Sequence, residues 1–270
     1  MRSIVNIERL PFNVVFASEP MPAFVTSSIF LAGPTPRSAD VPSWRPAALE
    51  ALYRLGYTGT VFVPEPRSAT DPFEWAAQVA WEEEALHRAD RIVFWVPRAM
   101  DTMPALTTNV EFGAWADSGK ALFGAPPGAA KVGYLAHYAE KFGQPTEDTL
   151  DGILRLAVES VGVGAGRSGG ECCVPLHVWK TASFQSWYAA QKAAGNRLDG
   201  ARVVWTFRVG PQRRVVFFWA LHANVWIGSE GRAKTNECVL SRPDIATIVL
   251  HGPRRGLETR VVLIRACRTP

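Results

Sequence analysis

Residues 91–96 have the sequence RIVFWV, a continuous apolar run after Arg91. Such a run is typical of a strand that is buried on both faces, as strands of a parallel sheet are. Two comparable runs precede it, at residues 28–32 (SIFLA) and 60–63 (TVFV), and a third follows at residues 121–124. We therefore expect these segments to be strands of one parallel sheet.

Segments with helical spacing of apolar residues separate these strands. The segment Trp44–Leu55 ends at Gly56, which suits a helix C-terminus. A helix is expected to open at Asp71 or Pro72, because Asp caps helices and Pro suits their first turn. Further helices are expected over residues 109–118, 132–141 and 146–161. This alternation predicts an open α/β sheet with helices on both faces and a ligand site at the carboxyl ends of its strands.

The chain divides into unlike parts. Residues 1–26 indicate an irregular arm with a short strand near Asn13–Phe16, and residues 27–161 hold the α/β pattern. Residues 162–174 (GVGAGRSGGECCV) are rich in small residues, which predicts a linker. Residues 175–270 predict a smaller α+β, mostly antiparallel domain. Its expected elements are a helix over 178–194 and strands over 202–209, 214–227, 238–240, 246–250 and 258–264.

Composition excludes several classes of protein. Of the 270 residues, 47% are hydrophobic and 20% charged, which supports a buried core and excludes wholesale disorder. No run of about 18 apolar residues is present, so no membrane span is expected. Glu8, Arg9 and Pro11 interrupt the apolar run that a signal peptide needs, so we expect a cytoplasmic protein.

Cysteine, histidine and charge carry weaker information. The four cysteines and five histidines show no metal-ligand spacing, so we expect reduced, mostly buried thiols, no metal and no cofactor.

Residues 1–160 hold 13 basic and 19 acidic residues, a net charge of −6, whereas residues 161–270 hold 16 basic and 6 acidic residues, a net charge of +10. The basic part could attract nucleic acid or a polyphosphate, or dock on the acidic part. Because only charge suggests nucleic acid, we do not expect it as a partner.

The segment Thr107–Ala116 (TTNVEFGAWA) begins after a strand and enters a helix. Thr108 or Asn109 can cap that helix, which would place Glu111 in its first turn, where the helix dipole favours an ionised carboxylate. An ionised carboxylate in a partly apolar pocket can attack an anomeric carbon. The alternative is that Glu111 only complements the helix dipole.

Three motifs in this order resemble the nucleoside 2-deoxyribosyltransferase superfamily. They are Ser28-Ile-Phe-Leu-Ala-Gly-Pro34, Ala89-Asp90-Arg91-Ile92-Val93, and Asn109-Val110-Glu111-Phe112-Gly113 followed by Gly119-Lys120. The resemblance covers about residues 27–160. It implies a Rossmann-like or flavodoxin-like domain that breaks N-glycosidic bonds of nucleosides or nucleotides, with Glu111 as the nucleophile that forms a glycosyl-enzyme intermediate. It also implies self-association, because relatives often complete their sites across a dimer interface.

The resemblance implies further site residues. Glu82 matches an acidic residue that helps to hold the sugar, although Glu82-Glu83-Glu84 could also be a solvated helix run. Transferases carry an Asp six residues before the nucleophile, where this chain has Ala105, so Asp101 is the nearest candidate acid. This departure favours hydrolysis over base transfer.

Substrate contacts are expected in two loops. Relatives that act on nucleoside 5′-monophosphates grip phosphate in the loop after the first strand, which here contains Gly33, Pro34, Arg37 and Ser38. The alternative is a proline-rigidified turn with a solvent-facing Arg37. Further expected contacts are Trp81, Thr107, Thr108 and Asn109.

The smaller domain has a fainter resemblance to the opening strands of Nudix domains. The residues that carry it are 205–207, 236–244 and 261–265. The Nudix box that binds Mg²⁺ is absent from the sequence, so we expect no pyrophosphatase activity. An alternative function for the whole chain is a non-catalytic nucleotide-sensing module coupled to the basic domain.

Overall fold

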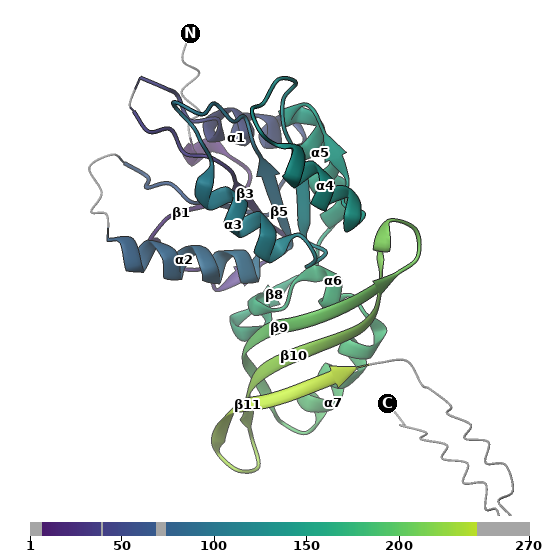
Figure 1. The fold of residues 1–270 in the computed structure, drawn as a ribbon. Helices are drawn as coiled ribbons and strands as arrows, with labels where there is room; N and C mark the ends of the chain where they lie inside the picture. The colour runs from purple at the N-terminus through teal and green to yellow at the C-terminus, as the bar shows by residue number, and fades with distance from the viewer. Residues whose placement is uncertain (1–6, 39, 69–73, 242–270) are drawn as a thin grey trace, which may run out of the picture.

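The structure is a computed structural model that describes residues 7–38, 40–68 and 74–241. Its larger domain is built on a parallel sheet of six strands in the order β1-β4-β3-β5-β6-β7 (Figure 1). The strands are β1 (Asn13–Phe16), β3 (Ser28–Ala32), β4 (Thr60–Val63), β5 (Arg91–Trp95), β6 (Ala121–Gly124) and β7 (Thr146–Glu147). The expected parallel sheet is confirmed, and the short strand expected near its N-terminal arm forms one edge, paired with β4.

Helices cover both faces of this sheet. They are α1 (Arg45–Arg54) and α5 (Leu150–Val161) on one face, and α2 (Trp75–Arg88), α3 (Leu106–Trp115) and α4 (Gly133–Lys141) on the other. Successive strand residues point to opposite faces, so Ile29 and Leu31 of β3 pack with α1 and α5, whereas Phe30 and Ala32 pack with the other helices. Both faces are apolar, which is why these strands lack polar alternation.

The strand order creates a crevice above β3 and β5. From β3 the chain passes to β4 on one side, and then to β5 on the other. Ligands of doubly wound sheets bind at such a switch point, beyond the carboxyl ends of the strands. Gly33 follows β3 with a φ of +150°, and a Cβ atom there would lie 2.1 Å from the carbonyl oxygen of Trp95. Only glycine lets the chain leave β3 so close to the end of β5.

The helix that carries Glu111 begins earlier than expected. Helix α3 starts at Leu106, and Ala105 precedes it with a φ of 57° and no side-chain cap. Thr108 and Asn109 therefore lie inside the helix, and neither is its N-cap. A buried arginine, Arg98, holds the preceding loop because its guanidinium donates to the carbonyl oxygen of Ala105 at 3.4 Å. Helix α3 begins directly after Ala105, so Glu111 lies in its second turn.

The residues expected to open the second helix, Asp71 and Pro72, lie outside the described residues. In the described part, α2 begins at Trp75. Its N-cap is Glu74, whose carboxylate accepts hydrogen bonds from the backbone N–H groups of Ala76 and Ala77. An acidic residue thus serves as the cap, a few positions later than expected.

The smaller domain is α+β, as expected, with an antiparallel sheet in the order β11-β10-β9. Its elements are α6 (Leu176–Trp179), α7 (Ala182–Ala193), η3 (Pro211–Arg213), β9 (Arg197–Val209), β10 (Val215–Ile227) and β11 (Arg232–Ser241). The helix expected over residues 178–194 is split, because Thr181 is extended and its hydroxyl accepts a hydrogen bond from the N–H of Phe184. The strands expected at 246–250 and 258–264 lie outside the described residues.

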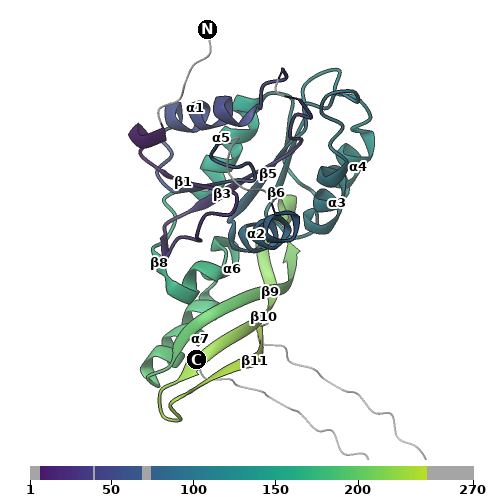
Figure 2. The same ribbon diagram turned by 90° about the vertical axis from the view of Figure 1, so that its left-hand side faces the viewer.

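The segment expected as a linker, residues 162–174, is folded. It contains β8 (Arg167–Ser168), which pairs with β2 (Phe24–Val25), and a short helix, η2 (Gly169–Cys173). Gly170 packs so tightly on β9 that a Cβ atom would lie 2.3 Å from the backbone of Asp199. The small residues of this segment therefore allow it to pack closely against the smaller domain. Figure 2 shows the smaller domain at the end of the parallel sheet where β5 begins, far from the crevice.

The cysteine expectation needs a correction. The described cysteines are free thiols, and Cys172 is buried, but Cys238 is exposed on β11. Successive strand residues point to opposite faces of the sheet, and Val239 packs on the core of the smaller domain, so Cys238 points away from that core. Cys267 lies outside the described residues.

Among the helices that the structure describes, none combines the length and the apolar character needed to cross a membrane.

Candidate active site

A cavity of about 600 Å³ lies in the crevice at the carboxyl ends of β3, β4 and β5. Its volume is typical of small-molecule sites. The loops after β3 and β4, helix α2 and the start of α3 form its walls. It brings together seven residues that the sequence analysis named: Gly33, Pro34, Arg37, Glu82, Thr107, Thr108 and Glu111.

Glu111 is half-buried in this cavity, and its pKa is raised to about 7. Burial is the largest cause, and the neighbouring carboxyl of Glu82 raises the pKa further, while Arg45 lowers it. The expectation that the helix dipole keeps Glu111 ionised is therefore wrong. The dipole acts mainly on the first turn, whereas Glu111 lies in the second turn, where loss of hydration dominates.

Glu82 of α2 lines the same cavity. One of its carboxylate oxygens accepts a hydrogen bond from the side-chain amide of Gln78 at 2.7 Å. Burial raises the pKa of Glu82, and the contacts with Gln78 and Arg45 partly offset that rise. Its neighbours Glu83 and Glu84 are exposed. The three acidic residues are thus not one solvated run, because the first of them faces the cavity.

Arg45, a buried arginine that lines the cavity, was not predicted from the sequence as a site residue. Only 1% of Arg45 is exposed. Its guanidinium donates to the carbonyl oxygens of Leu31 at 3.1 Å and Gly33 at 2.9 Å, and it forms an ion pair with Glu65. The available signal was its place in the helical pattern, since it lies three residues before the buried Ala48 and so on the apolar face of α1.

Other predicted site residues lie elsewhere. Asp101 and Ser38 are exposed and do not line the cavity. The side-chain oxygen of Asn109 accepts a hydrogen bond from Arg98 instead of facing the cavity. Trp81 belongs to the core, where its indole N–H donates to the carbonyl oxygen of Glu19 at 2.9 Å. The tryptophan at the cavity is Trp75, which is 70% exposed.

The chemistry of the cavity is that of carboxyl and guanidinium groups. No cluster of three or more histidine, cysteine or acidic side chains in the described ranges could hold a metal ion. The carboxyl groups of Glu65, Glu82 and Glu111 and the guanidinium groups of Arg37 and Arg45 line the walls. Carboxylates bind sugar hydroxyls and can attack carbon, and guanidinium groups bind phosphate.

Residues 26–129 match a family model described as nucleoside 2-deoxyribosyltransferase like. This segment contains every residue that lines the cavity. The match does not reach residues 175–270, so the resemblance of the smaller domain to Nudix proteins finds no support. The comparison with curated proteins found no match.

Proposed function

We propose that the cavity cleaves the N-glycosidic bond of a nucleoside or nucleoside 5′-monophosphate. The observation that carries the proposal is the convergence of Glu111 and Glu82, from two helices, on one cavity at the switch point of the sheet. That cavity lies within the segment that matches a family described by nucleoside deoxyribosyl transfer, which supports nucleoside glycosyl chemistry at the level of the family.

In the proposed reaction, the carboxylate of Glu111 attacks C1′ of the sugar. A C1′–O bond forms while the C1′–N bond breaks, and the base leaves with the electron pair of that bond and takes a proton from solvent. Water then hydrolyses the glycosyl ester, which releases the sugar and restores the carboxyl group of Glu111. Glu82 accepts a hydrogen bond from a sugar hydroxyl, and the charge of Arg45 favours the ionised form of Glu111.

We infer hydrolysis rather than transfer to a second base. Related transferases carry an Asp six residues before the nucleophile, and this chain has the apolar Ala105 there. The nearest acid in that loop, Asp101, lies outside the cavity. Transfer would need such a residue to take the proton of the incoming base, whereas in hydrolysis the proton of the attacking water can pass to Glu82, which lines the cavity, or to solvent.

Arg37 supports a preference for 5′-monophosphates. Its side chain lines the cavity, and its backbone N–H donates to the carbonyl oxygen of Thr102 at 3.0 Å, which holds the loop in place. Pro34 and Pro36 restrict the same loop, so little entropy is lost on binding. A guanidinium group there suits a dianionic phosphate better than a neutral 5′-hydroxyl.

The test is release of free base from a panel of nucleosides and their 5′-monophosphates. Glu111→Gln should lose on the order of 10³-fold or more in rate, because an amide cannot form the ester. Glu83→Gln, an exposed acid one residue from Glu82, is the matched control and should keep its activity. Near-normal turnover by Glu111→Gln would overturn the assignment, and nucleotide binding without any base release would favour the sensing alternative.

The same panel tests the phosphate preference. Arg37→Ala should weaken the use of monophosphates by roughly 10- to 100-fold, which corresponds to the loss of one charged hydrogen bond, and should leave nucleosides almost unaffected. Equal losses on both classes would mean that Arg37 has only a structural role.

A further inference from the structure

Two adjoining hollows, of about 590 and 330 Å³, lie between the two domains. They share Arg91, Ser160, His177, Arg214 and Val216, so they form one space, which we call the interdomain cavity. Arg91 begins β5, so this cavity lies at the amino end of the parallel sheet, opposite to the candidate active site. It shares no lining residue with that site.

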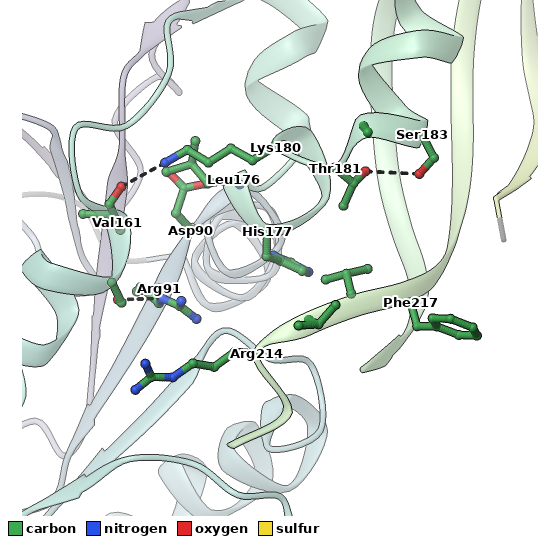
Figure 3. Close-up of a pocket in the computed structure, with 14 residues that line it drawn as sticks. Asp90, Arg91, Val161, Leu176, His177, Lys180, Thr181, Ser183, Arg214 and Phe217 are labelled. Atoms are coloured by element: carbon green, nitrogen blue, oxygen red, sulfur yellow. Dashed lines mark hydrogen bonds between the residues drawn. The ribbon is translucent and has the colours of Figure 1, made fainter. Parts of the chain in front are cut away.

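Basic side chains from both domains line the interdomain cavity. Arg91 comes from β5, Lys180 follows α6, Arg208 belongs to β9, and Arg213 and Arg214 lie at the turn into β10. Figure 3 shows Arg91, His177 and Arg214 together where the domains face each other. Burial is the largest cause that lowers the pKa of Arg91; Asp90 raises this pKa, and the guanidinium groups of Arg208 and Arg214 are close enough to lower it further.

Few carboxylates balance this charge. Among the described residues that line the cavity, the acids are Asp90 and Glu159. Asp90 is already neutralised, because both of its carboxylate oxygens accept hydrogen bonds from Arg167. Within the described part of the chain, the guanidinium of Arg91 donates to two neutral partners, the hydroxyl of Ser160 at 2.7 Å and the carbonyl oxygen of Gly119 at 2.6 Å.

The remaining cations are similarly short of anionic partners. Arg213 reaches Asp117 at 3.5 Å, and Arg208 donates to the backbone carbonyl of the same residue at 3.1 Å. Lys180 donates to a backbone carbonyl oxygen. The side chain of Arg214 is exposed and forms no hydrogen bond or ion pair with any residue that the structure describes, while its backbone N–H donates to the carbonyl oxygen of Pro211 at 3.3 Å. Like charges held together at this density repel one another, and an anion between them would relieve that repulsion.

His177 lines the centre of this space. Both of its ring nitrogens are inaccessible to solvent and have no hydrogen-bond partner among the described residues. Buried polar groups are normally hydrogen-bonded, so an unpartnered one in a cavity needs an explanation. Because both nitrogens are closed off from the open space, a ligand in the interdomain cavity would reach an imidazole N–H only after the ring of His177 turned.

We propose that the interdomain cavity binds a small polyphosphate-bearing molecule, with Arg91 and Arg214 as its central contacts. Cations from several elements line this partly open volume, which suits a compact anion of high charge. The backbone of a nucleic acid would instead need basic residues spread along an exposed face. Because the contacts come from both domains, the bound ligand would join them. This inference does not depend on the proposed glycosidase activity.

The test is calorimetric titration of the full chain with inorganic tripolyphosphate at fixed ionic strength. Arg214→Ala should weaken binding roughly 10-fold or more, the effect expected for one charged hydrogen bond. Because the side chain of Arg214 is exposed and has no hydrogen bond or ion pair with a described residue, this variant should fold normally, which circular dichroism checks. Arg232→Ala removes the same charge from the start of β11, away from the cavity, and should bind like the parent chain.

Two outcomes would overturn the proposal. The first is no binding of tripolyphosphate at millimolar concentration, or an equal loss in Arg214→Ala and Arg232→Ala, which would indicate only nonspecific charge attraction. The second is tight binding of a duplex oligonucleotide that tripolyphosphate does not displace. That result would assign the basic residues to a nucleic-acid surface instead.

Discussion

At the scale of single residues, the environment of Glu111 decides what the candidate site can do. A nucleophile must be ionised, yet burial and the neighbouring Glu82 favour the protonated form and raise the pKa of Glu111 to about 7. The buried guanidinium of Arg45 works in the opposite direction. Buried charges are costly, so this arrangement is more typical of a functional site than of a stabilising one.

The raised pKa predicts a pH dependence of the rate. If the carboxylate of Glu111 attacks C1′, kcat/KM should rise with pH from about 6 to about 8, because deprotonation produces the active form through a pKa of about 7. Base release measured across pH 5–9 on the preferred substrate tests this. A flat profile down to pH 5, or a rate that falls as the pH rises through 7, would contradict it.

At the scale of elements, the loop after β3 shapes the site. Arg45 donates to carbonyl oxygens on both sides of the strand end, at Leu31 and Gly33. The indole N–H of Trp44 donates to the carbonyl oxygen of Pro34 at 3.1 Å. Helix α1 therefore positions the loop that carries Arg37, through hydrogen bonds that begin at the very start of that helix.

Gly33→Ala should destabilise the protein by about 2–4 kcal/mol. The added Cβ atom would lie 2.1 Å from the carbonyl oxygen of Trp95, and a backbone must shift to relieve that overlap. Gly128→Ala is the matched control, since Gly128 has a φ of +83° but nothing within 4 Å of its Cβ position. It should lose only about 1 kcal/mol from backbone strain. Urea denaturation measures both, and equal losses would contradict the steric explanation.

At the scale of the whole molecule, one buried ion pair ties the domains together. The side chains of Arg167 and Asp90 are both fully buried. The Nη2 atom of Arg167 lies 2.6 Å from the Oδ2 atom of Asp90. Asp90 also accepts hydrogen bonds from the N–H groups of Ser28 at 2.8 Å and Leu176 at 2.7 Å. One carboxylate thus connects β3, the segment between the domains and α6.

Arg167→Met should destabilise the protein by about 3–5 kcal/mol, because it leaves Asp90 buried without its counter-charge. Guanidinium chloride denaturation measures the loss. Arg155→Met, at an exposed arginine of α5, is the control and should change the stability little. The double variant with Asp90→Asn should lose less than the sum of the two single losses, since no unpaired charge remains. Additive losses would mean that the pair is not coupled.

The parallel sheet of the larger domain and the helices on its two faces were predictable from the sequence. Continuous apolar runs at Ser28–Ala32, Thr60–Val63 and Arg91–Val96 predicted the buried strands, because only a strand covered on both faces tolerates such a run. The loops that follow these strands located the site, because carboxyl ends of parallel strands meet at one edge. Glu111 and Glu82 were named from motifs, and they line one cavity.

Which charged side chains lie next to one another, and how deeply they are buried, followed from the tertiary structure. Burial and the carboxyl of Glu82, from another helix, raise the pKa of Glu111, which the sequence predicted to be ionised. Arg167 and Asp90 are 77 residues apart in sequence, so no local pattern could pair them. Local sequence sets the backbone preference of each segment, but burial and electrostatics depend on neighbours that distant segments supply. For that reason the positions of the strands followed from the sequence, whereas the charge state of the site and the contact between the domains did not.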